Sequence, residues 1–141
     1  LTGYFTENII VTPHMKEMSR LTGIQIEEMK ENPVRTAREF ADQYGVVCVL
    51  KDAATVIAGR DGKTFVNGSG TPAMAKGGSG DVLTGVIAGL VALGLEESDA
   101  AALGVYVHGL AGEAAEQHFG VHGVLAGEIA DCLPEVYRDG I

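Results

Sequence analysis

The chain has 141 residues, of which 46% are hydrophobic and 21% are charged. This balance excludes an intrinsically disordered chain, which combines low hydrophobicity with high charge. Nineteen acidic and ten basic residues give a net charge of −9, which disfavours non-specific nucleic-acid binding, and we expect no nucleic-acid partner. The length fits one domain, and we predict a single domain over residues 1–141.

The number of cysteines and the length of the apolar runs indicate where in the cell the protein is expected to work. Cys48 and Cys132 are too few for a disulfide scaffold, which favours a reducing, cytoplasmic location. The uncharged apolar run of residues 82–95 is too short to cross a bilayer, so we expect no membrane partner. The chain starts at Leu1 without a methionine or a basic leader, and we expect it to be a segment of a longer protein.

Short apolar runs alternate with amphipathic stretches in the first half of the chain. Residues 9–11 predict a strand that ends before Pro13. Residues 46–50 are continuously apolar, which is typical of a strand buried on both faces of a parallel sheet. Two further runs flank the turn Gly59–Gly62 and predict a hairpin. The predicted strands are 9–11, 46–50, 55–58 and 63–66, and the predicted helices are 14–21, 24–30 and 33–44.

The second half begins with a glycine-rich loop, residues 67–80, and continues with helical patterns. The predicted helices are 80–94, 98–118 and 124–137. The alternation of predicted strands and helices along the chain predicts an α/β fold. Gly85 and Gly89 lie four residues apart, so we predict that the first of these helices packs closely on a neighbour.

Glycine is the residue type that departs most from the average. Twenty residues are glycine, roughly twice the usual share, and ten of them fall between Gly59 and Gly94. Gly77, Gly78 and Gly80 directly precede or open a predicted helix, where backbone N–H groups have no partner inside the helix. Without side chains in the way, a phosphate reaches those N–H groups, and Ser79 adds a hydroxyl. We therefore predict an anion-binding cradle at residues 77–80.

Asp81 follows the cradle and has two interpretations. A carboxylate at a helix start often serves only as a cap, which stabilises the helix by about 1 kcal/mol. Alternatively, Asp81 lies beside a bound phosphate, where it orients or deprotonates an attacking hydroxyl. The residues alone leave both interpretations open.

Several other motifs do not fit the functions that they imitate. Gly62–Thr64 resembles the end of a phosphate-binding P-loop, but Ile57 stands where that motif needs glycine. His118 and His122 are four residues apart, but a glycine separates them, which disfavours a metal site there. His108 lies in an apolar helix and is expected to be a hydrogen-bonded core residue. Cys48 is expected to be inert packing.

Four stretches of the chain resemble the carbohydrate-kinase-like domain of ADP- or ATP-dependent NAD(P)H-hydrate dehydratases, in the ribokinase-like superfamily. The stretches are Val11–Met18, Val49–Ile57, Ala73–Gly85 and Val105–Gly112. The third, with Lys76-Gly77-Gly78-Ser79-Gly80-Asp81 at its centre, is the most specific of the four. The resemblance covers the C-terminal half of that domain. It implies a ribokinase-like partial domain with a central, mostly parallel sheet flanked by helices.

The resemblance also implies a repair reaction on hydrated NADH or NADPH. The enzyme removes the ring hydroxyl as water, through phosphoryl transfer to that hydroxyl and elimination of phosphate. The implied cofactors are ADP or ATP with Mg²⁺. The implied partners are the hydrated substrate, a further copy of the chain in a homo-oligomer, and the missing N-terminal half or a fused epimerase domain.

Individual residues take roles from the resemblance. His14 is implied to contact the hydrated nicotinamide nucleotide, and Asp81 to contact the substrate and act in catalysis. From the residues alone, His14 also fits a helix start. Glu17 either helps to place Mg²⁺ or faces water, and the metal ligands are otherwise unknown. The residues expected to bind the nucleotide are Lys51, Asp52, Ala53, Ala54, Thr55, Gly77, Gly78, Ser79 and Gly80, with Asp52 standing where the family has glycine.

Two other functions remain open at this point. A ribokinase-like kinase for a small alcohol, such as a vitamin precursor, would use the same cradle and the same Asp81. A non-catalytic nucleotide-binding fragment would use the cradle alone. The reaction product distinguishes the dehydratase from the kinase, because dehydration restores NAD(P)H whereas a kinase leaves a stable phosphate ester.

Overall fold

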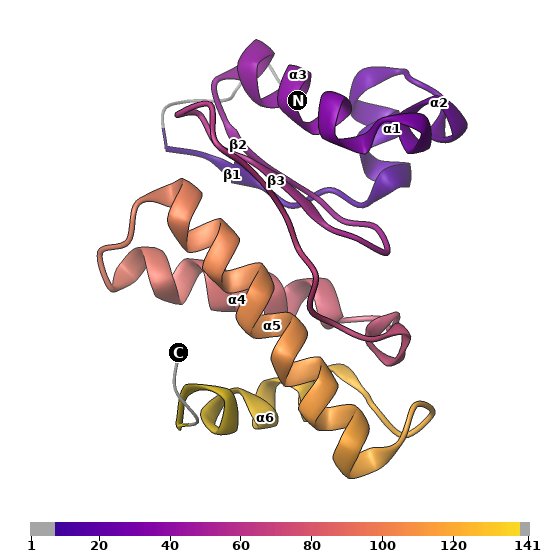
Figure 1. Cartoon of the computed structure of the whole chain (residues 1–141), viewed down its shortest axis with the longest axis vertical. Coiled ribbons are helices and arrows are strands. Elements are labelled where there is room, and N and C mark those ends of the chain that lie inside the picture. Colours follow the sequence, from indigo (N-terminus) through magenta and orange to yellow (C-terminus); the bar gives the residue numbers. More distant parts are fainter. Residues whose placement is uncertain (1–7, 139–141) are drawn as a thin grey trace. The chain divides into compact units, whose positions relative to one another are not determined.

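The computed structural model of the chain describes residues 8–138 (Figure 1). Its residues divide into two compact units. Among the described residues, unit 1 comprises 8–67 and 96–102, and unit 2 comprises 68–95 and 103–138. The prediction that the chain is a single domain stays a prediction.

Unit 1 contains a four-stranded sheet in the order β1-β2-β3-β4. The strands are β1 (Ile10–Val11), β2 (Val47–Leu50), β3 (Val56–Ala58) and β4 (Thr64–Val66). Strands β1 and β2 are parallel, whereas the β2–β3 and β3–β4 pairs are antiparallel. The α/β class and the hairpin are confirmed, but the sheet is mixed rather than mostly parallel. The physical reason is loop length, because a short connection joins only antiparallel neighbours and a parallel pair needs a crossover.

Three helices cover one face of this sheet (Figure 1). They are α1 (Met15–Thr22), α2 (Ile26–Glu31) and α3 (Pro33–Tyr44). Pro33 begins α3, where the Asn32 side chain accepts a hydrogen bond from the Arg35 amide at 2.9 Å, and Gly45 ends the helix with φ +64°. All four residues of β2 are buried, as predicted for this strand. The core between the helices and the sheet contains Met15, Met18, Met29, Ala37, Phe40, Ala41, Val46, Cys48, Leu50, Val56 and Ala58.

Unit 2 is helical. It contains the short helix η2 (Pro72–Met74), α4 (Ser79–Ala92), α6 (Ala126–Arg138) and most of α5 (Glu97–Phe119). The three long helices confirm the predicted ranges to within two residues. The close approach of α4 and α5 occurs at Gly104, where an added Cβ would lie 2.7 Å from the side chain of Ile87.

The predicted role of Gly85 and Gly89 in helix packing is wrong. Both residues are exposed, and an added Cβ at either would meet no atom within 4 Å. The buried side of α4 is formed instead by Leu83, Val86, Ile87 and Leu90. Because α4 is apolar on most of its circumference, the sequence pattern did not distinguish the buried face from the exposed one.

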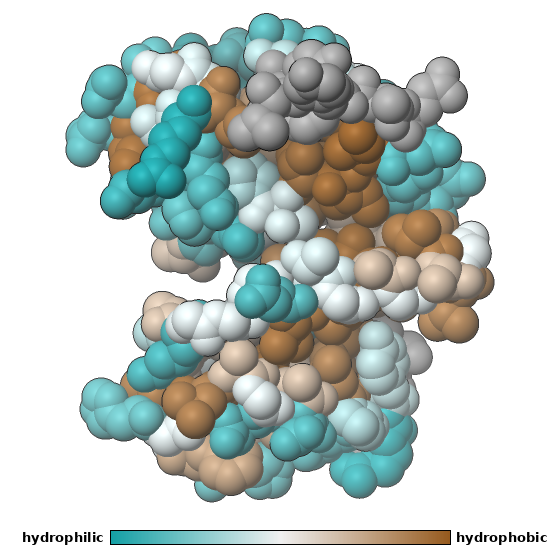
Figure 2. All heavy atoms as spheres, turned by 180° about the vertical axis from the view of Figure 1, so that it is seen from behind, coloured by the Kyte–Doolittle hydropathy of each residue, from teal (hydrophilic) through white to brown (hydrophobic). Residues whose placement is uncertain are grey.

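On the face shown in Figure 2, apolar residues gather in several brown areas between hydrophilic ones. Leu93 is 79% exposed and Leu125 is 60% exposed. Among residues 8–138, no helix combines the length and the apolar character that crossing a membrane requires.

Candidate functional site

In unit 1, the predicted ligand contacts lie at one end of the sheet. His14 follows β1 and Lys51 follows β2, and the two residues form an isolated parallel bridge beyond these strands. The Lys51 amide donates a hydrogen bond to the Pro13 carbonyl at 2.8 Å. The structure therefore brings a predicted substrate contact next to a predicted nucleotide contact. Ligands of open α/β sheets bind at this edge, beyond the carboxyl ends of the strands.

His14 is the N-cap of α1. Its Nδ1 atom accepts a hydrogen bond from the Glu17 amide at 3.1 Å, and the Glu17 carboxylate accepts one from the His14 amide at 2.8 Å. This reciprocal arrangement is a capping box, with histidine in place of the usual serine or threonine. The side chain of His14 is 50% exposed, so one side of the imidazole faces solvent. The helix-start interpretation is confirmed, and it leaves part of the ring open to a ligand.

Glu17 is occupied by the same capping box. One carboxylate oxygen binds the His14 amide, and the other lies 3.5 Å from Nε2 of the His14 ring. The carboxylate is also about half exposed. Its oxygens are thus already used in fixing the start of α1, which makes Glu17 a poor candidate for a metal ligand.

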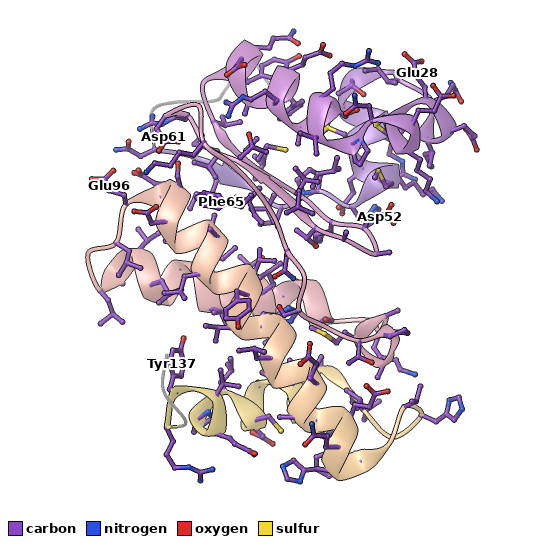
Figure 3. All side chains as sticks on the ribbon, in the orientation of Figure 1. Glu28, Asp52, Asp61, Phe65, Glu96 and Tyr137 are labelled. Atoms are coloured by element: carbon purple, nitrogen blue, oxygen red, sulfur yellow. The ribbon has the colours of Figure 1, made fainter. Side chains whose placement is uncertain are left out.

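The loop of residues 51–55 joins β2 to β3. Asp52, Ala53 and Ala54 are exposed, whereas Lys51 and Thr55 are partly buried. Asp52 lies at the opposite end of the hairpin from Asp61 (Figure 3). The residues of this loop that were predicted to bind a nucleotide are thus accessible, at the end of the sheet where His14 also lies.

A charged cavity lies at the other end of the unit 1 sheet, near Asp61. It is lined by Arg60, Asp61, Lys63, Glu96, Glu97, Ser98 and Asp99. The two basic residues are already paired, because Lys63 contacts Asp61 at 3.0 Å and Arg60 lies 4.0 Å from Glu97. The side-chain hydrogen bond between Asp61 and Lys63, helped by the attraction of their charges, lowers the pKa of the carboxyl group and raises that of the ammonium group. This cavity contains none of the predicted site residues.

In unit 2, the predicted cradle is an exposed turn at the start of α4. Gly78 is the N-cap of this helix, with φ +89°, a conformation that residues with a Cβ rarely adopt. The Ser79 amide bonds the Lys76 carbonyl at 3.3 Å, and the Asp81 amide bonds the Gly78 carbonyl at 3.0 Å. The amides of Gly77, Gly78 and Gly80 make no hydrogen bond to any residue that the structure describes. These three donors are therefore available to an anion.

Asp81 occupies the third position of α4 and is exposed. Within residues 8–138, its carboxylate takes part in no hydrogen bond or ion pair. The cap position belongs to Gly78, so Asp81 does not cap the helix through a side-chain hydrogen bond. What remains of the capping interpretation is the general attraction between a negative charge and a helix N-terminus.

Ser79 differs from the glycines around it. Its side chain is buried, and its hydroxyl lies 3.4 Å from Nε2 of His108 on α5. His108 is itself 7% exposed, which confirms the expectation of a hydrogen-bonded core histidine. The Ser79 hydroxyl thus holds the first turn of α4 against α5.

The loop before the cradle is also held on α5. Ser69 donates a hydrogen bond to the Tyr106 carbonyl at 2.9 Å, and Glu113 accepts one from the Gly70 amide at 2.7 Å. An added Cβ at Gly109 would collide with Ser69, and one at Gly112 would collide with Met74. The glycines of the Val105–Gly112 stretch therefore make room for the loop that positions the cradle.

Lys76 is a residue of this site that sequence reasoning did not select. It is exposed and immediately precedes Gly77. Its ammonium group forms no ion pair among the residues that the structure describes. In a chain with a net charge of −9, a lysine adjoining three free amides supplies the local positive charge that an anion needs. The position of Lys76 directly before two glycines is the feature of the sequence that could have identified it as part of this site.

Cys48 faces the core of unit 1 from β2. Burial raises the pKa of its thiol to about 12, and the positive charge of Arg38 opposes this effect only in part. A thiol held in its neutral form is a poor nucleophile. The expectation that Cys48 is inert packing is confirmed.

Known proteins resemble this chain in sequence and in fold. The profile of the family described as NAD(P)H-hydrate dehydratase matches residues 2–135. The bifunctional NAD(P)H-hydrate repair enzyme of Moorella thermoacetica is 45% identical over 93% of this chain and 25% of its own length. The chain thus spans a quarter of the length of this relative.

Solved structures give the same result. The ADP/ATP-dependent NAD(P)H-hydrate dehydratase of Bacillus subtilis, co-crystallised with ATP and Mg²⁺, is 39% identical with a TM-score of 0.88, over 92% of this chain and 47% of that one. A ribokinase-like superfamily protein of Enterococcus faecalis is 32% identical with a TM-score of 0.80, over 96% of this chain and 46% of that one. The ribokinase-like fold is thereby confirmed. With a profile match over nearly its whole length, the chain belongs to the NAD(P)H-hydrate dehydratase family.

Proposed function

We propose that the protein bearing this chain catalyses the nucleotide-dependent dehydration of hydrated NADH or NADPH. The observation that carries the proposal is the cradle of free amides at Gly77, Gly78 and Gly80, with the unpaired carboxylate of Asp81 beside it. Membership of the NAD(P)H-hydrate dehydratase family supports the choice of substrate. The name of the B. subtilis relative supports ADP or ATP as the nucleotide.

In this proposal the cradle binds the terminal phosphate of the nucleotide. The amides of Gly77, Gly78 and Gly80 donate hydrogen bonds to its oxygens, and the helix N-terminus and Lys76 add positive charge. Ser79 positions the turn through His108 rather than through a contact of its hydroxyl with phosphate. Lys51, Asp52, Ala53, Ala54 and Thr55 supply the further nucleotide contacts.

Asp81 acts on the substrate. Its carboxylate accepts the proton of the ring hydroxyl, while the hydroxyl oxygen forms a bond to the transferring phosphorus atom. The bond between that phosphorus and the leaving nucleotide oxygen breaks in the same step. Elimination then breaks the ring C–O bond and releases phosphate, while the adjacent ring carbon gives up a proton to the departing phosphate or to water. The C=C bond that forms between these two carbons restores the reduced nicotinamide. His14 holds the nicotinamide nucleotide through the exposed side of its imidazole.

Mg²⁺ fits this arrangement as the counter-ion of the nucleotide phosphates. Asp81 is the carboxylate closest in sequence to the cradle, and oxygen donors are what Mg²⁺ prefers. When bound, the ion neutralises phosphate charge. Glu17 is not assigned to it, because both of its oxygens already face His14.

The test is the recovery of NAD(P)H absorbance from hydrated NADH, with ADP or ATP as the second substrate. It is run on the natural full-length protein and on residues 1–141 alone. Recovery that depends on the nucleotide supports the proposal. A stable phosphate ester of a small alcohol, without recovery from the hydrate, identifies a kinase instead. Absence of both products from the full-length protein leaves only a nucleotide-binding module.

The proposal extends to the setting of the protein. Both cysteines are free and buried, which is consistent with a reducing cytoplasm. We also expect a homo-oligomer, which light scattering of the full-length protein tests directly.

A further inference from the structure

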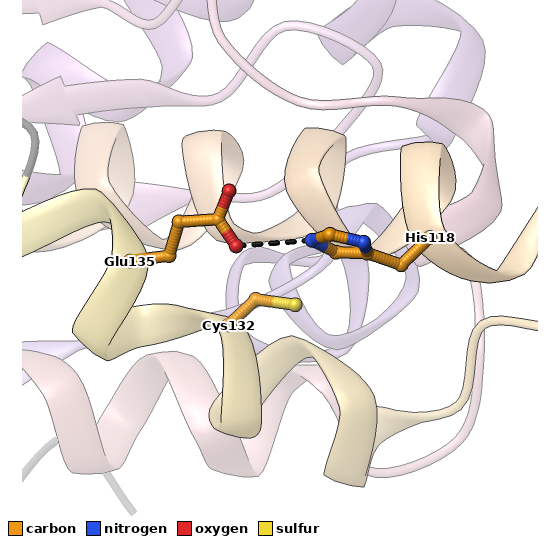
Figure 4. A group of neighbouring side chains, drawn as sticks. All are labelled: His118, Cys132 and Glu135. Carbon is orange, nitrogen blue, oxygen red and sulfur yellow. Dashed lines mark hydrogen bonds and ion pairs between the residues drawn. The ribbon is translucent and has the colours of Figure 1, made fainter.

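Helices α5 and α6 bring three metal-binding side chains together, none of which belongs to the proposed dehydration site. His118 lies in the last turn of α5, and Cys132 and Glu135 lie three residues apart on α6. Side chains at this spacing share one face of a helix. Figure 4 shows the imidazole, the thiol and the carboxylate directed toward the same space. We call these three residues the His118 cluster.

The distances within the His118 cluster suit a bound ion. Nε2 of His118 lies 3.0 Å from a carboxylate oxygen of Glu135. One ligand atom from each residue lies within 4.8 Å of the other two. Ligands of a tetrahedral zinc ion are about 3.5 Å apart, given bond lengths of about 2.0–2.3 Å. The ligand atoms thus lie near the separations that a bound zinc ion sets.

The exposure of the cluster separates it from an ordinary surface ion pair. The side chains of His118 and Glu135 are 52% and 38% exposed, so an ion reaches them from solvent. Cys132 is only 6% exposed and lies beneath them. An exposed ion pair such as His118–Glu135 forms without a buried thiol beside it, and such a pair contributes little to stability. The sulfur atom of Cys132 supplies the third ligand that distinguishes a metal site from an ion pair.

The type of metal follows from the donor atoms. An imidazole nitrogen, a thiolate sulfur and a carboxylate oxygen together select Zn²⁺ or a similar transition metal. Mg²⁺ and Ca²⁺ are disfavoured, because they prefer oxygen ligands alone. The sequence analysis considered only His118 with His122 and disfavoured a metal site there, and His122 is not part of the cluster. The other two members of the cluster, Cys132 and Glu135, come from α6.

We propose that His118, Cys132 and Glu135 form a zinc-binding site that joins the end of α5 to α6, with a fourth coordination position open to water. The site is separate from the proposed dehydration and does not depend on it. Bound zinc stabilises the packing of these two helices in unit 2. It also blocks oxidation or alkylation of the Cys132 thiol.

The experiment titrates the untagged 141-residue chain with Zn²⁺ by calorimetry and with Co²⁺ by absorption spectroscopy. We expect one ion per chain and a near-ultraviolet charge-transfer band from thiolate to cobalt. The variants Cys132→Ser and His118→Gln should each bind zinc at least about tenfold more weakly. Cys132→Ser should also abolish the band. The control is His122→Gln, which removes an exposed neighbouring histidine and should leave binding unchanged.

Two results overturn the proposal. One is a wild-type chain that binds zinc no more tightly than His118→Gln, and the other is a charge-transfer band that persists in Cys132→Ser. A melting-temperature scan adds a second measurement, since Zn²⁺ should raise the melting temperature of the wild-type chain but not of His118→Gln. Because Cys132→Ser alters a buried position, the exposed variants His118→Gln and Glu135→Gln keep the test valid if Cys132→Ser does not fold.

Discussion

The loop before α4 and the loop after β2 are both proposed to bind the nucleotide, yet they offer it different chemistry. The loop before α4 presents main-chain amides of glycines, and its shape depends on a left-handed residue, Gly78. The loop after β2 presents side chains, including the exposed Asp52. A side-chain contact changes with a single substitution, whereas a main-chain donor is lost only when a new side chain blocks it or bends the backbone. The two loops should therefore respond to mutation in different ways.

The largest effect is expected for Asp81→Asn. An amide does not accept the hydroxyl proton, so turnover should fall by about 100-fold or more, while nucleotide affinity stays within about twofold. The measurements are NAD(P)H recovery and calorimetry with ADP. Asp99→Asn is the matched control, because Asp99 is also an exposed acid in the first turn of a long helix. Equal turnover in the two variants would remove Asp81 from the mechanism.

Next in size is the loss of nucleotide affinity in Gly78→Val. The left-handed conformation disfavours any Cβ by about 1–2 kcal/mol, and here the added atom would also lie 3.1 Å from Ala126. We expect ADP affinity to fall about tenfold or more. Gly94→Val is the control, because Gly94 has φ +97° and open space around it. If both variants retain affinity for ADP by calorimetry, the cradle is not the phosphate site.

Side-chain contacts should give smaller effects, beginning with His14→Asn. Asparagine is a good N-cap, so α1 should keep its start while the imidazole is lost. We expect KM for the hydrated substrate to rise several-fold, with kcat changed less, because one hydrogen bond is worth about 1 kcal/mol. Steady-state kinetics on the full-length protein measure this, and unchanged KM would remove His14 from the substrate site.

Asp52→Asn should have the opposite sign. Removing a negative charge near the nucleotide phosphates should tighten ADP binding by about two- to fivefold at low ionic strength, and added salt should erase the gain. Asp61→Asn, at the other end of the sheet, should leave the affinity unchanged (Figure 3). Weaker binding in Asp52→Asn would contradict the idea that this residue faces phosphate.

The last prediction concerns the buried thiol of Cys48, whose effect is confined to alkaline pH and is absent at neutral pH. In the unfolded chain the thiol ionises near its ordinary pKa of 9.0, whereas in the folded chain its pKa is about 12. The unfolded state therefore binds fewer protons above pH 9, and the free energy of unfolding should fall there by at most about 1.4 kcal/mol per pH unit. Below pH 9 the contribution is fully present. Urea denaturation at a series of pH values gives the free energy of unfolding of wild type and of Cys48→Ala. The pH dependence of this free energy should differ between the two only above pH 9.

Local sequence patterns predicted most of the secondary structure and the open amides at the start of α4. The strand–turn–strand pattern around Gly59–Gly62 predicted a hairpin that the structure contains, because turn residues and short loops act locally. The cradle was predictable for a similar reason, since three glycines at a helix start leave amides open whatever lies beyond them. The ranges of α4, α5 and α6 followed from apolar patterns that run the length of each helix.

Contacts between distant segments were decided by tertiary structure alone. The sequence suggested that the Ser79 hydroxyl serves the ligand, but packing against His108 turns it inward. Gly104, and not Gly85 or Gly89, provides the close approach between helices, because only packing shows which side of an apolar helix is buried. The His118 cluster joins residues from two helices. Spacing along one chain segment predicts what a turn or a helix start does, whereas a site shared by separate segments exists only once those segments pack together.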